Sequence, residues 1–163
     1  MQSSPGISER ILETTVAEKD LGVLIDPLLD FDKHINNIVK KANSVSCMII
    51  RGITHKIKDI LIPLYKSLVR SILEYANPVW CPYLRKHIDL IEGVQRRFTK
   101  HIIGCSGLSY IDRLKVLGLP SLEFRRTRGD LIKVYKIMHG LYDSKLPLHY
   151  LNLLYLVLQE DIT

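Results

Sequence analysis

Apolar residues recur at a helical spacing through most of the chain after residue 32. A first helix is predicted from Asp32, expected as its N-cap, to a stop at Gly52. Its apolar face is formed by Ile35, Ile38, Ala42, Val45 and Ile49. A second helix is predicted over 58–74, and Pro63 should start it late or kink it. The residues expected to face inward are Ile60, Leu61, Leu64, Tyr65, Leu68 and Ile72.

Three further helices follow from the same pattern. Residues 76–83 contain two prolines and are expected to be a rigid, non-helical connection that packs Trp80. A third helix is predicted over 84–103, ended by Gly104, with an apolar face of Leu84, Ile88, Ile91, Phe98 and Ile102. A fourth should cover 110–117, between Ser109 as cap and Gly118. A fifth should begin at Ser121, with Glu123 in its first turn, and end near Gly140. An amphipathic piece is expected after Pro147.

The start of the chain has a different pattern. Residues 11–16 and 20–26 are short, apolar and rich in β-branched side chains, and "AEK" separates them. This pattern predicts a small β-hairpin in which Gly22 marks a bulge or a close approach of another backbone. The expected fold class is therefore mainly α: a helical bundle preceded by a short β-hairpin.

Charge is distributed unevenly along the 163 residues. Residues 1–32 hold 2 Lys/Arg and 7 Asp/Glu, residues 33–140 hold 20 and 7, and residues 141–163 hold 1 and 3. The net charge of +6 therefore comes from a middle region of +13 between two acidic ends. A positive field of this kind attracts a polyanion, and nucleic acid is favoured over an anionic membrane surface.

The ends of the sequence and its cysteines indicate an intracellular protein, cytoplasmic or nuclear. The first ten residues have neither the basic nor the apolar region of a secretory signal. The apolar stretch 148–158 has about half the roughly 20 residues that a membrane span needs, so no membrane partner is expected. Three cysteines without C-x-x-C spacing fit a reducing compartment.

Known catalytic motifs are absent from the sequence, so no catalytic residue, metal or cofactor is assigned. No G-x-S-x-G, G-x-x-x-x-G-K-[ST] or H-E-x-x-H occurs. A two-metal site is one interpretation of the acidic residues Asp20, Asp26, Asp30 and Asp32. The favoured interpretation makes Asp32 a helix cap and makes Asp26 and Asp30 turn residues around Pro27. The histidines and cysteines lack zinc-ligand spacing.

Two clusters of basic residues are candidates for phosphate contacts. At 100° per residue, the third and fifth helices each carry a narrow basic arc around a glycine. The first arc contains Lys86, Gly93, Arg97 and Lys100, and the second contains Arg126, Gly129, Lys133 and Lys136. Glycine costs a helix about 1 kcal/mol relative to alanine, and here it would let a phosphate strand come near. The alternative is that the glycines permit close helix packing and that the charges form a solvated face.

Other charged and aromatic residues favour structural roles. Arg85 with Asp89, and Glu92 with Arg96, have the i, i+4 spacing of intrahelical ion pairs. The aromatic residues are interpreted as core rather than as stacking platforms for bases: Tyr65, Tyr75, Trp80, Tyr83 and Phe98.

Several phrases in the sequence closely resemble one family. These are "EKDLGVLID", "HINNIVKKAN", "LEYANPVWCPY", "VQRRFT" and "LGLPSLEFRRTRGDLIKVYKIMHG". Their order and spacing are similar to the region just downstream of the catalytic core in reverse transcriptases of LINE-type (non-LTR, jockey-like) retrotransposons. The resemblance covers about residues 10 to 142.

This resemblance implies the end of a polymerase palm followed by a thumb. Leu21 and Gly22 then correspond to the primer-grip hairpin that positions a primer end, and the later helices to a thumb that embraces an RNA–DNA duplex. The catalytic aspartates and Mg²⁺ ligands of the family would lie upstream of Met1, and no D-D pair occurs in the chain.

The sequence thus predicts a non-catalytic fragment that grips an RNA–DNA or DNA duplex through phosphate contacts, and whose partners could include missing palm and fingers domains. The expected divisions are a palm-end hairpin at 1–31, a thumb-like helical domain at 32–142 and a divergent tail at 143–163. The expected contacts are made by Leu21, Gly22, Lys86, Arg97, Lys100, Arg126, Lys133 and Lys136. The alternatives are a helical protein-interaction module and a degenerate transposon relic without activity.

Overall fold

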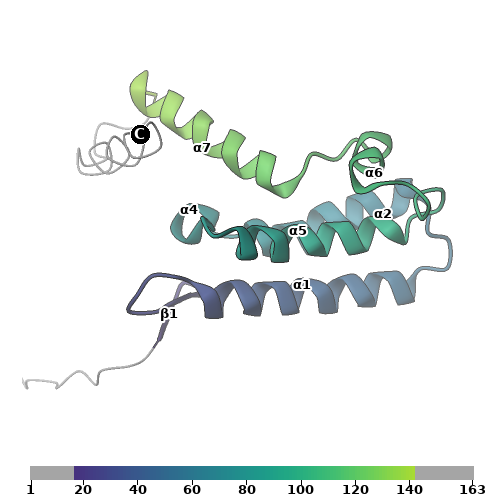
Figure 1. The fold of residues 1–163 in the computed structure, drawn as a ribbon, viewed down its shortest axis with the longest axis horizontal. Coiled ribbons are helices and arrows are strands. Elements are labelled where there is room, and N and C mark those ends of the chain that lie inside the picture. Colours follow the sequence, from purple (N-terminus) through teal and green to yellow (C-terminus); the bar gives the residue numbers. More distant parts are fainter. Residues whose placement is uncertain (1–16, 142–163) are drawn as a thin grey trace, which may run out of the picture. The chain divides into compact units, whose positions relative to one another are not determined.

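The computed structural model of the chain describes residues 17–141. These residues are mainly helical and begin with a short antiparallel β-hairpin, which confirms the expected fold class (Figure 1). The chain divides into two compact units between Arg113 and Leu114. The expected boundary at 31/32 falls inside the first unit and stays a prediction, and the tail at 143–163 and the amphipathic piece after Pro147 lie outside the described residues.

The hairpin is shorter than expected and its turn is elsewhere. Strands β1 (Glu18–Asp20) and β2 (Val23–Ile25) pair in antiparallel register. The two turn residues, Leu21 and Gly22, both have positive φ angles, of 43° and 89°. A two-residue turn of this type matches the right-handed twist of paired strands.

The expected loop at 17–19 is therefore wrong, because Glu18 and Lys19 belong to β1. Gly22 lies in the turn rather than at a bulge, since the turn needs a residue that accepts positive φ. The first expected strand, 11–16, lies outside the described residues.

Helix α1 (Asp32–Gly52) ends where the sequence predicted, but its start differs. Asp32 is the first helical residue and does not cap the helix with its side chain. Instead the Asp32 backbone N–H donates to Asp30 Oδ1 at 2.9 Å. The carboxylate of Asp30 therefore accepts a backbone N–H at the start of α1. The expected apolar face is present: Ile35, Ala42 and Ile49 are buried.

The expected second helix is a continuous helical path with an irregular middle. It consists of α2 (Lys58–Leu64), a π-helical segment η1 (Tyr65–Val69) and α3 (Arg70–Glu74). The π-helical segment directly follows Pro63, which has no N–H to donate to the preceding turn. The helix does not start late, and the irregularity near Pro63 is a widened turn, where a late start or a kink was expected.

The wider turn changes which residues face the core. The buried residues are Leu61, Tyr65, Val69 and Leu73, whereas Ile60 and Leu68 are exposed and Leu64 and Ile72 are half-buried. The inward set expected from a regular 3.6-residue period is therefore wrong at Ile60 and at the positions beyond Tyr65. The π-helical segment takes up one extra residue, which moves the buried positions from 68 to 69 and from 72 to 73.

Residues 76–83 contain one turn of helix, α4 (Asn77–Trp80), where none was expected. Pro78 lies in the first turn, where its missing N–H has no intrahelical partner to lose. Trp80 is buried as predicted, and its Nε1–H donates to the Tyr75 carbonyl at 2.7 Å.

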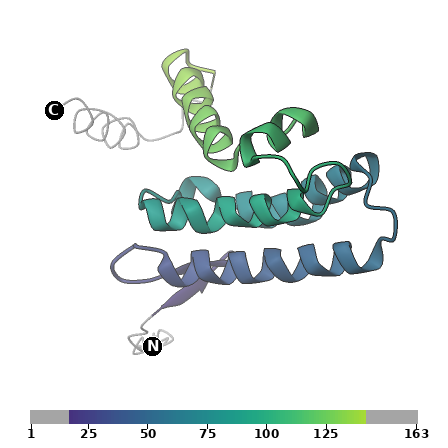
Figure 2. The same cartoon turned by 45° about the vertical axis from the view of Figure 1, so that its right-hand side comes forward.

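Helix α5 (Arg85–Lys100) stops short of the predicted end at 103, and the chain turns at Gly104 with φ 82°. The expected intrahelical pair of Arg85 with Asp89 is present at 3.3 Å. Helices α1 and α5 lie side by side in both ribbon views (Figures 1 and 2).

A buried polar network joins α5 to its neighbours in the first unit. The Tyr65 hydroxyl of η1 donates to Gln95 Oε1 at 2.6 Å, and the Tyr65 ring lies 5.0 Å from the Phe98 ring. Gln95 Nε2 donates to the Tyr110 hydroxyl at 3.1 Å, and Tyr110 donates to Glu92. Buried polar groups need such partners, so this network fixes one arrangement of the helices.

The fourth and fifth predicted helices are confirmed. Helix α6 (Tyr110–Leu117) follows Ser109, whose Oγ accepts the Asp112 N–H at 3.3 Å, and Gly118 ends it. Helix α7 (Leu122–Met138) follows Ser121, whose Oγ accepts the Phe124 N–H at 3.1 Å. Within residues 17–141 no helix has the length and apolar character needed to cross a membrane.

Candidate nucleic-acid interface

The outer face of α1 is basic and carries almost no acidic charge. From residue 33 to residue 58 the chain has six Lys/Arg and no Asp or Glu. Lys33, Lys40 and Arg51 are exposed, and at 100° per residue they fall within about 20° of one another around the helix. Lys41 is exposed beside them. A row of basic side chains of this kind is a surface to which a phosphate backbone can bind.

A shallow depression of about 480 Å³ lies at the N-terminal end of this face. Its lining residues are Asp32, Lys33, Asn36, Asn37 and Lys40. Asp32 is the one carboxylate among them, and it accepts hydrogen bonds from both Lys86 and His87. Its negative charge is therefore already matched by a neighbouring lysine.

A second hollow, which we call the hairpin groove, lies between the hairpin tip, α1 and α3. Its volume is about 450 Å³. It is lined by Lys19, Leu21, Gly22, Asn37, Ile38, Lys41, Ser71, Ile72 and Tyr75. Asn37 lines both hollows, so the hairpin groove adjoins the depression along α1.

The predicted site residues Leu21 and Gly22 form one wall of the hairpin groove. The Tyr75 hydroxyl donates to the Leu21 carbonyl at 2.9 Å. A Cβ on Gly22 would lie 3.6 Å from Tyr75 Cε1, so the ring packs closely on the turn. This contact fixes the hairpin tip against α3.

Two of the five aromatic residues expected in the core are on the surface. Tyr75 and Tyr83 are 56% and 71% exposed. Tyr65, Trp80 and Phe98 are buried as predicted. Tyr75 is exposed because it lies at the end of α3, where the backbone leaves the helix and turns toward α4.

The predicted basic arc of α5 lies along α1. Lys86 Nζ is 3.1 Å from an Asp32 carboxylate oxygen, and Arg97 Nη2 donates to Asn43 Oδ1 at 3.1 Å. The two contacts are eleven residues apart in both helices, which means that α1 and α5 run in the same direction. Lys100 is exposed at the end of α5. Lys86 and Arg97 therefore tie α5 to α1.

The glycine within this arc lies under an arginine of the same helix. A Cβ on Gly93 would lie 3.4 Å from Arg97 Nη1, so the guanidinium group lies over the glycine. A separation of 3.4 Å from the end of a flexible side chain is an ordinary van der Waals contact, so the Arg97–Asn43 hydrogen bond does not require a glycine here. Both interpretations of Gly93 therefore stay predictions.

The second predicted arc lies on α7, in the second unit. Arg126 is buried. Lys133 Nζ lies 3.7 Å from Asp130 Oδ1, and Lys136 is exposed. A Cβ on Gly129 would have no neighbour within 4 Å. Of the predicted site residues, Leu21 and Gly22 lie together at the hairpin tip. Three others lie together on α5: Lys86, Arg97 and Lys100. The remaining three belong to the second unit: Arg126, Lys133 and Lys136.

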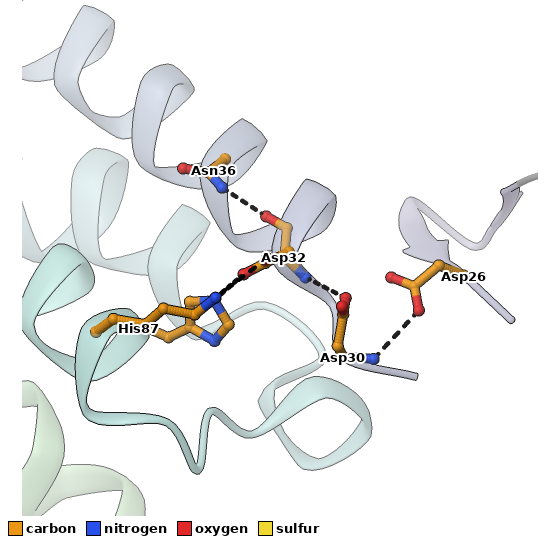
Figure 3. A network of polar contacts seen from close by, with 6 residues as sticks. Asp26, Asp30, Asp32, Asn36 and His87 are labelled. Carbon is orange, nitrogen blue, oxygen red and sulfur yellow. Dashed lines mark hydrogen bonds and ion pairs between the residues drawn. The ribbon is translucent and has the colours of Figure 1, made fainter. Parts of the chain in front are cut away.

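The aspartates around Pro27 hold the turn before α1, as the favoured interpretation predicted (Figure 3). Asp26 Oδ1 accepts the Asp30 N–H at 3.1 Å, and Asp30 in turn accepts the Asp32 N–H. Hydrogen bonds from Lys86 and then His87 hold the pKa of Asp32 below its usual value of 3.8. Across residues 17–141 no three His, Cys, Asp or Glu side chains gather where they could hold a metal ion.

Five residues that belong to the α1 face or line the hairpin groove were not singled out as site residues in the sequence: Lys19, Lys33, Lys40, Lys41 and Tyr75. The absence of acidic residues between 33 and 58 is the signal that could have identified the α1 face. No comparable signal exists for Tyr75, because its exposure depends on where α3 ends.

Comparisons with known proteins provide one distant relative. No family model matches the chain, and no solved structure matches it. An uncharacterized protein of Caenorhabditis elegans, B0403.1, is 25% identical over 126 residues, which are 76% of this chain. The match covers 64% of that relative, so the chain spans slightly less than two thirds of its length.

Proposed function

We propose that the chain grips a nucleic-acid duplex, RNA–DNA or DNA, through phosphate contacts along α1. The observation that carries the proposal is the exposed face of Lys33, Lys40 and Arg51 in a stretch of the chain without acidic residues. Lys41 and Lys19 extend the basic surface into the hairpin groove. Binding of this kind is tolerant of base sequence, because phosphates are the same at every step.

The resemblance to LINE-type reverse transcriptases agrees with this proposal. In that interpretation the hairpin ends a palm, the helices from α1 onward act as a thumb, and the chain binds duplex without extending it. The sequence has no adjacent aspartate pair to hold the two Mg²⁺ ions of polymerisation. The arcs on α5 and α7 remain proposed secondary contacts. Their exposed members are Lys86, Arg97, Lys100 and Lys136, of which Lys86 and Arg97 also contact α1.

The proposal is tested by reversing charge on α1. The double variant Lys33→Glu, Lys40→Glu should bind an RNA–DNA hybrid at least about tenfold more weakly, because two phosphate contacts become repulsive. Fluorescence anisotropy with a labelled hybrid measures the affinity.

The matched control is the pair Lys66→Glu, Lys115→Glu, which makes the same charge change at exposed lysines outside α1 and the hairpin groove. Equal weakening by both double variants would mean that net charge, and not the α1 face, governs binding. That result would reject the proposed interface.

A second candidate function is a protein-interaction module. It is favoured by β1, whose three residues are all exposed in a sheet that has two strands within residues 17–141. A two-stranded hairpin is marginal alone, and an open strand edge can pair with another chain. Self-association in sedimentation velocity, together with no hybrid binding at low salt, would favour this function.

A further inference from the structure

The hairpin groove combines the chemical features that a single nucleotide requires. Its walls carry two lysines, Lys19 and Lys41, and no acidic residue. The exposed Tyr75 and the amide side chain of Asn37 are also part of the lining. Its volume of about 450 Å³ falls in the range of about 300–1,000 Å³ that is typical of pockets for small ligands.

We propose that the hairpin groove binds one unpaired nucleotide at the end of a strand whose phosphates follow α1. The base stacks on Tyr75, and Lys19 and Lys41 contact the flanking phosphates. This inference rests on the proposed function, because the α1 face holds the rest of the ligand. It adds a preference for duplexes that carry a single-stranded end.

Tyr75 is positioned for stacking before any ligand arrives. Its hydroxyl is held by the Leu21 carbonyl, and its ring packs on Gly22. Since the ring is fixed on one side and 56% exposed, little side-chain freedom is lost when a base covers it. Base–aromatic stacking tolerates any base, which fits a sequence-independent grip.

Leu21 supports the same conclusion. Its side chain is 84% exposed although its backbone has a φ angle of 43°, where leucine is disfavoured. Strained residues of this kind concentrate at binding sites. In the hairpin groove Leu21 provides an apolar contact for the nucleotide beside Tyr75.

The groove shares Asn37 with the depression that contains Lys33 and Lys40. Lys33 and Lys40 are seven residues apart, which is about 10 Å along a helix that rises 1.5 Å per residue. A strand can therefore pass from the groove onto α1 without crossing an unpaired carboxylate. The order of contacts is Tyr75 at the strand end, then Lys41, Lys40 and Lys33.

The test compares three labelled RNA–DNA hybrids of the same paired sequence: blunt, with a short 5′ overhang, and with a short 3′ overhang. The full chain should bind at least one overhang about fivefold or more tighter than the blunt hybrid, as expected for one stacked base. Tyr75→Leu should abolish this preference and leave blunt affinity within about twofold, whereas Tyr75→Phe, which keeps the ring, should retain it.

The matched control is Tyr83→Leu, at an exposed tyrosine outside the hairpin groove, which should leave the preference unchanged. Thermal unfolding of Tyr75→Leu checks that it folds. The inference would be overturned if the chain bound the blunt hybrid and both overhang hybrids equally well, or if folded Tyr75→Leu kept the preference for an overhang. The proposed function would stand in either case. Failure to bind any hybrid at low salt would instead reject the proposed function.

Discussion

Leu21 is the residue at which the fold and the proposed binding would make opposite demands. A two-residue hairpin turn with positive φ angles favours Asn or Gly at its first position, and this chain has an exposed leucine there. A left-handed conformation costs an ordinary L-residue about 1–2 kcal/mol. Residues that break a local rule in this way are expected at functional sites.

Replacing Leu21 with asparagine should stabilise the protein. Leu21→Asn relieves the turn strain and should raise the free energy of unfolding by about 1 kcal/mol. Thermal or urea unfolding measures the change. Leu28→Asn is the control, because Leu28 is equally exposed, at 85%, and is not among the residues with positive φ. Equal effects of the two substitutions would mean that exposure, and not strain, determines the result.

The attachment of the hairpin to α1 should depend on pH through His34. Its Nδ1 accepts the Leu24 N–H at 3.2 Å, which requires a neutral ring, and burial lowers the pKa of His34 below 6.5. The unfolded chain therefore binds more protons than the folded chain as pH falls. The contribution of neutral His34 to the free energy of unfolding should be fully present above about pH 6.5 and should decrease below it.

Urea unfolding between about pH 7.5 and 5 measures this loss. This pH range lies above the one in which Asp32 titrates, because the pKa of Asp32 is lowered. His34→Asn keeps an acceptor near the Nδ1 position but does not titrate, so its stability should change less over the same range. A wild-type stability that is constant over this range would contradict the assignment.

At the scale of single residues, the sequence predicted roles that depend on local chemistry. Ser109 and Ser121 cap helices as expected, because a cap needs only its own neighbours in the chain. The sequence could not show in the same way that Tyr75 is exposed and Tyr65 is buried. Both follow apolar residues at helical spacing, and only the end of α3 leaves Tyr75 exposed.

At the scale of elements, helical periodicity located the helices but not the widened turn. The expected inward positions 60, 61, 64, 65, 68 and 72 are those of one face of a regular α-helix. The observed buried positions are 61, 65, 69 and 73, so those beyond Tyr65 come one residue later. Pro63 indicated an irregularity, but a proline can end, kink or widen a helix, and tertiary packing decides which.

Deleting one exposed residue from the π-helical segment should be tolerated. Without Ser67, the segment can become a regular α-helix that keeps the same four residues buried. We expect a loss of about 1.5 kcal/mol or less in urea unfolding. Deletion of exposed Asn36 from α1 is the control, since it rotates buried residues on either side by about 100° and should cost about 3 kcal/mol or more. Similar losses for both deletions would show that the extra residue is needed.

At the scale of the whole molecule, the uneven charge predicted a polyanion partner but not which basic residues would face it. Twenty Lys/Arg occur between residues 33 and 140. Some hold the fold together, as Lys86 does with Asp32 and Arg97 does with Asn43. Choosing between a contact within the protein and a contact with a ligand requires the helix packing, which sequence periodicity alone does not provide.

The salt dependence of hybrid binding is the most direct test of the central claim, that the α1 face and the hairpin groove grip nucleic acid through phosphates. If Lys19, Lys33, Lys40 and Lys41 each neutralise one phosphate, the logarithm of the affinity should fall by about 3 to 4 per logarithmic unit of salt. In a filter-binding titration with an RNA–DNA hybrid, the account predicts a roughly 100-fold loss of affinity between about 50 and 200 mM salt. An affinity that does not change over this range, or no binding at its low end, would contradict it.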